Sequence, residues 1–252
     1  MKKINSIKSD IEHTIHSKAT KWFDKQQLNY IYPDIKRSIE SINNYSQDIS
    51  NKSIKKIKNS AKYHQFLDSV SEILVLGYFI NKFKKNKEIT IEYERKTNGN
   101  KNIDISIINL LEKNVNIEVI TLHHNQSIQQ QRDNQVDQQI LFWQNTTNYS
   151  QSIKSKIKDK LESGQIPKNE YNFVWVVNDS TADEIDFEWV VNTGYTPDNT
   201  EKRLMTMGLP DIIKFKNYPE ITGIIYSRWD VNKNKYKKII QNLNISKIRM
   251  IL

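Results

Sequence analysis

The chain contains no cysteine, only six glycines and five prolines, and no long apolar segment. The lack of cysteine excludes disulfides, a thiolate metal site and a cysteine nucleophile. With so few glycines, neither a glycine-rich phosphate loop nor a nucleophile elbow is found. No window approaches the roughly 20 apolar residues of a membrane span. The N-terminus, residues 1–6, lacks the apolar core of a signal peptide. We therefore expect a soluble intracellular protein, in the cytoplasm.

The charged residues are unbalanced towards the basic side. Lysine and arginine together number 38 against 29 acidic residues, which gives a formal net charge of +9. A basic balance favours a polyanionic partner such as nucleic acid. Lysine far outnumbers arginine, and asparagine and isoleucine are abundant, so AT-rich coding is an alternative source of the same charge.

The first 60 residues have the pattern of helices. Isoleucines recur three and four residues apart over residues 4–15 and again over 35–42, as amphipathic helices require. Pro33 ends an aromatic patch between the two stretches. Residues 43–58 are polar and rich in lysine, and could form either a mobile connection or a basic helix.

A helix followed by three strands is expected next. Apolar residues predict a helix over residues 63–83. Alternation predicts a strand over 89–94, and Asn98-Gly99 predicts a hairpin turn into a return strand over 103–107. A third strand is expected over 115–121.

The remaining chain alternates between helical and strand patterns. Short apolar runs predict buried strands. A serine with a glutamine three residues later resembles a capping box and predicts the start of a helix. The expected elements are helices over 127–143, 150–164 and 200–215, strands over 173–177 and 221–226, and a terminal helix over 235–243.

Three acidic residues lie inside these apolar segments. Glu72 is in the helix, Asp104 in the second strand and Glu118 in the third. Burying a carboxylate costs several kcal/mol unless a cation or hydrogen-bond donors compensate it. Each acid alone could be explained by a salt bridge, a turn or an edge strand. All three in this order predict one site for Mg²⁺ or Mn²⁺, which bind carboxylate and phosphate oxygens.

The same residues resemble the motif of the PD-(D/E)xK nuclease superfamily. Glu72 matches the helical glutamate of that pattern, Asn102-Ile103-Asp104 matches its Pro-Asp position, and residues 117–120 match its Glu-x-Lys strand. The resemblance covers roughly residues 63–180. It implies an α/β fold with a restriction endonuclease-like central mixed sheet flanked by helices, and a site in which Glu72, Asp104 and Glu118 hold the metal and perform catalysis.

One position departs from the family pattern. Ile120 stands where the resemblance implies a lysine that positions water and stabilises charge. Either a displaced lysine supplies this cation or the protein no longer cleaves. Lys156 and Lys160, one helical turn apart on the following helix, are candidates for the displaced lysine, and Lys101 beside Asp104 is another.

The residues just after the third strand are weaker candidates. They could lie at the rim of the site and contact nucleic acid, but a polar helix face or an incidental loop would have the same composition. They are His123, His124, Gln126, Gln129 and Gln130.

These observations predict a helical N-terminal extension over residues 1–60 and a nuclease-like domain over 61–252. The expected function is metal-dependent hydrolysis of DNA phosphodiester bonds. The alternative is an inactive protein of the same fold that acts as a nucleic-acid-binding or assembly module. A protein-binding role through Trp22 and Phe23 ranks last. The resemblance also allows a homodimer, because many proteins of this fold cut two strands as dimers.

Overall fold

The computed structural model describes ten stretches of the chain. The predicted turn at Asn98-Gly99 and the predicted helices over 127–143 and 200–215 lie outside them. The described residues are 13, 15–21, 23, 25–97, 102–122, 155–162, 166–178, 218–231, 235–238 and 245–252.

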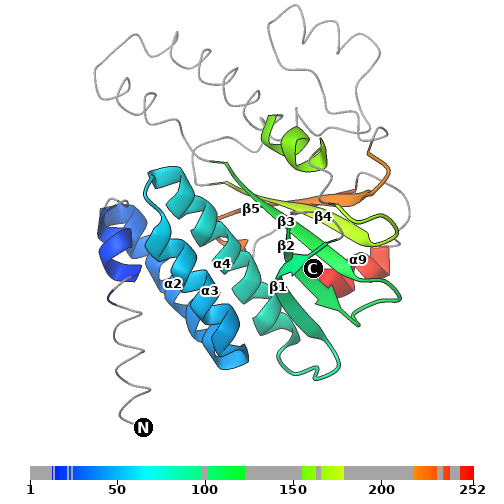
Figure 1. Ribbon diagram of the computed structural model, residues 1–252, viewed down its shortest axis with the longest axis horizontal. Coiled ribbons are helices and arrows are strands. Elements are labelled where there is room, and N and C mark those ends of the chain that lie inside the picture. Colours follow the sequence, from blue (N-terminus) through cyan, green and yellow to red (C-terminus); the bar gives the residue numbers. More distant parts are fainter. Residues whose placement is uncertain are drawn as a thin grey trace, which may run out of the picture.

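Three consecutive helices come directly before the sheet (Figure 1); the third packs against the strands, and the first two pack against the third. They are α2 (Lys25–Tyr45), α3 (Gln47–Asn59) and α4 (Tyr63–Phe83). Pro33 does not end a helix but lies inside α2. Ser46 separates α2 from α3, because its side chain accepts the main-chain N–H of Ile49 and caps α3. The lysine-rich segment is therefore a helix and not a mobile connection.

The strands form one mixed sheet in sequence order. β1 and β2 form an antiparallel hairpin, β2 pairs antiparallel with β3, and β3, β4 and β5 run parallel. The strands are β1 (Thr90–Lys96), β2 (Asn102–Ile108), β3 (Val115–Leu122), β4 (Tyr171–Asn178), β5 (Ile221–Arg228) and β6 (Lys235–Lys238).

The predicted terminal helix over residues 235–243 is wrong at its start. Residues 235–238 form β6, which pairs antiparallel with β5 and places Tyr236 opposite Ile225. The alternation of Tyr236 with lysines suits an edge strand, where charged residues discourage further pairing. The last helix is α9 (Ile245–Ile251) instead.

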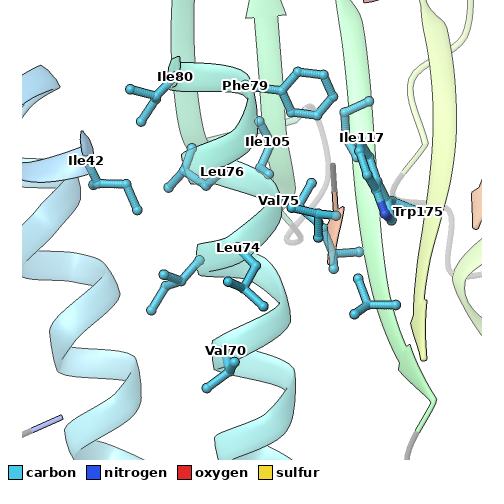
Figure 2. Close-up of a cluster of buried hydrophobic side chains, with 14 of the residues drawn as sticks. Ile42, Val70, Leu74, Val75, Leu76, Phe79, Ile80, Ile105, Ile117 and Trp175 are labelled. Atoms are coloured by element: carbon cyan, nitrogen blue, oxygen red, sulfur yellow. The ribbon is translucent and has the colours of Figure 1, made fainter. Parts of the chain in front are cut away.

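The central helix of the fold is α4, which is buried between α2 and the sheet. Figure 2 shows Ile42 of α2 on one side of α4 and Ile117 and Trp175 of the sheet on the other. Gly77 permits this close approach, because a Cβ there would lie 2.5 Å from the Cβ of Ser38 on α2. Because α4 is covered by a helix on one side and by the sheet on the other, its side chains are apolar on nearly all sides.

The other face of the sheet has a smaller core. Ile157 and Leu161, on the helix of residues 155–162, pack with Ile120 of β3 and Val174 of β4. Side chains alternate between faces along a strand, so Ile120 points away from α4 while Val119 points towards it. Helices therefore cover both faces of the sheet (Figure 1).

The expectation of an α/β protein with N-terminal helices and a mixed sheet is confirmed. Ile35 and Ile42 of α2 belong to the same buried cluster as Ile105 of β2. The domain boundary at residue 60 stays a prediction. None of the described helices combines the length and apolarity that crossing a bilayer requires.

Candidate functional site

The candidate site lies where β2 and β3 stop pairing. Their register runs only from Ile107↔Val115 to Ile105↔Ile117. Beyond that point the Asp104 side chain takes the place of a main-chain acceptor, and its Oδ2 receives the N–H of Val119 at 2.8 Å. The end of pairing thus brings the Asp104 carboxylate between the two strands.

Lys160 joins the two strand carboxylates. Its Nζ lies 2.8 Å from Oε2 of Glu118 and 3.3 Å from Oδ2 of Asp104. The Glu118 side chain is only 3% exposed and that of Asp104 12%. Burial alone would lower the pKa of Lys160, but the charges of Asp104 and Glu118 outweigh it and raise that pKa above its ordinary value. Lys160 is therefore a protonated counterion of both acids at neutral pH.

Glu72 approaches the same place from α4. Its Oε2 accepts hydrogen bonds from Lys56 of α3 at 2.6 Å and from the Tyr93 hydroxyl of β1 at 2.7 Å. Lys56 also pairs with Glu94 at 2.9 Å. Glu94 has a φ of 55°, a conformation uncommon for a residue with a side chain. This left-handed residue lets Tyr93 and Glu94 both reach the Glu72–Lys56 pair.

The pKa of Glu72 reflects its buried position close to a second carboxylate. Burial raises the pKa of Glu72, and the nearby charge of Asp104 raises it further. Lys56 and Tyr93 oppose this shift, but the net pKa remains above the ordinary value. The ionised form of Glu72 is thus undercompensated, and an added cation would favour it.

Asp68, one helical turn before Glu72, is a fourth acid that the sequence analysis missed. Burial raises its pKa against the opposing effects of Lys156, Thr121 and Lys160. Thr121 is on β3, so Asp68 lies near the end of that strand and near both lysines. Its spacing of four residues from Glu72 placed it on the same face of α4 and could have indicated it.

A buried polar network lies next to the site, on neighbouring residues of the same strands. Arg95 of β1 donates to Ser106 of β2 at 2.9 Å and to Asn116 of β3 at 3.0 Å, and it pairs with Glu170. Asn116 also donates to Asn172 of β4 at 2.8 Å. These bonds cross four strands and fix their relative positions beside Asp104 and Glu118.

The donor set of the site fits a hard divalent cation. The five carboxylates of Asp68, Glu72, Glu94, Asp104 and Glu118 face three lysines, Lys56, Lys156 and Lys160, which leaves a formal charge of −2. Within the described stretches, no three carboxylates or histidines are placed to hold one metal ion together. Mg²⁺ does not need three, because it is usually bound through one or two carboxylates with water and phosphate oxygens as the other ligands.

The sequence-predicted residues therefore separate into distinct groups. Asp104, Glu118 and Lys160 are in direct contact, while Glu72 is held by Lys56 and is near Asp104 without joining a three-ligand set. Lys156 donates instead to the main-chain oxygen of Thr121 at 2.6 Å. The remaining candidates lie outside the described residues; they are Lys101, His123, His124, Gln126, Gln129 and Gln130.

Lys56 and Tyr93 contact Glu72 but had no signal in the sequence. They come from the helix before α4 and the strand after it, and their pattern is that of an ordinary basic helix and an ordinary strand.

Comparison of the chain with protein families, with curated proteins and with solved structures finds no match.

Proposed function

We propose that this protein is a metal-dependent nuclease that hydrolyses phosphodiester bonds of DNA. The observation that carries the proposal is the contact of Lys160 with both Asp104 and Glu118, buried where two strands separate. Two carboxylates and one fixed ammonium group provide, respectively, ligands for a divalent cation and a positive charge for a phosphate.

The order of elements supports the resemblance to the PD-(D/E)xK nucleases. That resemblance implies a helix with a glutamate, a hairpin with an aspartate on its second strand, a third strand, a helix and a further strand. The chain has α4, the β1–β2 hairpin, β3, the helix of residues 155–162 and β4, with β4 parallel to β3. The restriction endonuclease-like fold is part of this proposal.

In the proposed site Asp104 and Glu118 would hold Mg²⁺ or Mn²⁺, and Glu72 would contribute charge from the adjoining helix. A bound divalent cation supplies water activation and neutralises charge on the phosphate. Lys160 takes the place of the lysine that the family motif has at position 120, where this chain has a buried isoleucine. Because its pKa is raised, Lys160 acts as a positive charge and hydrogen-bond donor towards the phosphate and not as a general base.

A cleavage assay on plasmid and single-stranded DNA tests the proposal. Wild type is compared in Mg²⁺ and in Mn²⁺ with Asp104→Asn and Glu118→Gln, which keep the side-chain shape but remove the charge. Glu92→Gln, a change of the same kind at an exposed position of β1, is the control. We expect cleavage by wild type and by the control, and none by the two site variants. Cleavage that survives both substitutions would refute the assignment of the site.

A second function, nucleic-acid binding without cleavage, is favoured by one specific observation. Each strand carboxylate already has an ammonium partner in Lys160, so the pairs are partly neutralised in the absence of metal. This alternative predicts DNA binding that weakens steeply with salt. It also predicts no turnover with either metal, so the cleavage assay separates the two functions.

A further inference from the structure

Helix α3 exposes a face of lysines to solvent. It contains four lysines and one acidic residue, Asp48. Lys52, Lys55 and Lys58 are exposed, whereas Ile54 and Ile57 are buried. Apolar and basic residues thus occupy opposite sides of the helix, and the basic side is available to a partner.

The fourth lysine of α3 links this face to the candidate site. Lys56 lies one turn after Lys52, so the two side chains follow one another along the same side of the helix. Lys56 turns towards the sheet and contacts Glu72 and Glu94. The lysine face therefore reaches the edge of the site through a residue that is itself bound to a site carboxylate.

The spacing of the exposed lysines suits a phosphate backbone. Lys52 and Lys58 are six residues apart, which is about 9 Å along a helix with a rise of about 1.5 Å per residue. One strand of a DNA duplex advances about 3.4 Å per phosphate. The face could therefore neutralise about two or three consecutive phosphates. Lysines crowded on one face repel each other, and a polyanion relieves that repulsion.

We propose that Lys52, Lys55 and Lys58 of α3 bind the sugar–phosphate backbone of a nucleic acid and guide it to the carboxylates at the end of the β2–β3 pairing. This inference rests on the proposed function for the identity of the partner. It assigns a role to the exposed lysines of α3, which make no contact with the carboxylates of the site. The contacts are to phosphates, so they carry no base sequence preference.

The test compares two triple variants with the same change of charge. The first is Lys52→Ala, Lys55→Ala and Lys58→Ala, in which alanine favours the helix. The control is Lys84→Ala, Lys85→Ala and Lys87→Ala, three exposed lysines just beyond the C-terminal end of α4. Lys84 is 12 residues from Glu72, or about 18 Å along the helix direction. Binding of a labelled DNA duplex is followed by fluorescence anisotropy without divalent metal over a range of salt concentrations.

We expect the α3 variant to bind at least about tenfold more weakly near 0.1 M salt, with the slope of log affinity against log salt reduced by about two. The control should keep most of the wild-type affinity and slope. An equal loss in both variants would mean that net charge alone attracts DNA, and an unchanged α3 variant would mean that another surface binds it. Either result overturns the inference.

A parallel cleavage assay in Mg²⁺ separates this inference from the proposed function. If wild type cleaves DNA but the α3 variant binds normally, the inference fails and the nuclease stands. If the α3 variant binds weakly but wild type does not cleave, the nuclease fails and the binding surface stands. Circular dichroism of both variants verifies that the helices are intact.

Discussion

Replacing Lys160 by methionine should make the fold depend on divalent metal. Methionine is unbranched and only one atom shorter, but it leaves Asp104 and Glu118 without the cation that lies 3.3 Å and 2.8 Å from them. Removing one partner from a buried ion pair costs about 3–5 kcal/mol. The low exposure of Glu118, 3%, places this variant in that range.

The loss should vary with pH and with metal. In wild type the folded pKa of Lys160 is raised, so its contribution is full below the unfolded pKa of about 10.4 and is lost only as pH rises through the folded value. Mn²⁺ at about 100 times its dissociation constant would restore about 2.7 kcal/mol.

The assay is urea unfolding followed by tryptophan fluorescence, with and without Mn²⁺. Lys158→Met is the matched control, because Lys158 is on the same helix but half exposed and pairs with Glu162 only at 3.7 Å. That variant should lose no more than about 0.5 kcal/mol. A cost below about 1 kcal/mol for Lys160→Met would refute the reasoning, since the two carboxylates could then not be buried and charged. A full cost without rescue by Mn²⁺ would confirm the ion pair and refute the metal site.

Three further predictions concern α4. Gly77→Ala should cost about 1–3 kcal/mol in urea unfolding, because the new Cβ meets Ser38 at 2.5 Å, and Ser38→Gly in the same chain should recover part of that loss; an additive loss would contradict the close contact. Burial and the charge of Asp104 raise the pKa of Glu72 in the folded protein. Ionisation of Glu72 therefore lowers the stability: the loss begins as pH rises past the unfolded pKa and is complete above the folded pKa. The stability of wild type relative to Glu72→Gln should accordingly decline as pH rises from about 4 to 7, and a rising difference would show that the sign is wrong. Asp68→Asn should raise the Mg²⁺ concentration needed for cleavage by about 10–100-fold, as loss of a residue that orients the site does. DNA binding without metal should stay unchanged, and a matching loss of binding would indicate a structural role instead.

Local patterns predicted the elements that position the site. The helix expected over residues 63–83 is α4. It could be predicted because it has more apolar residues than a single amphipathic face needs and has no glycine or proline in its first or last turn. The alternation around Asp104 and Glu118 likewise indicated β2 and β3 as strands. Spacing on the following helix also indicated Lys160 as a candidate, and the structure places it against both acids.

Long-range pairing explains what the sequence analysis missed. Residues 235–238 are lysine-rich and compatible with a helix, and only their pairing with β5 makes them a strand. Lys56 and Tyr93 approach Glu72 because α3 and β1 pack beside α4, which no local pattern encodes. For the same reason the sequence could place three acids near one another but could not show that lysines pair with each of them.

The most direct test of the central claim is to measure bound Mn²⁺ and plasmid nicking in the same samples, for wild type and for Asp104→Asn. Electron paramagnetic resonance reports the free Mn²⁺, and gel electrophoresis reports the nicked plasmid. The proposed function predicts that nicking by wild type rises as Mn²⁺ binds and that the variant loses both. Nicking at full rate by the variant, or a wild type that neither binds Mn²⁺ nor nicks, would contradict it.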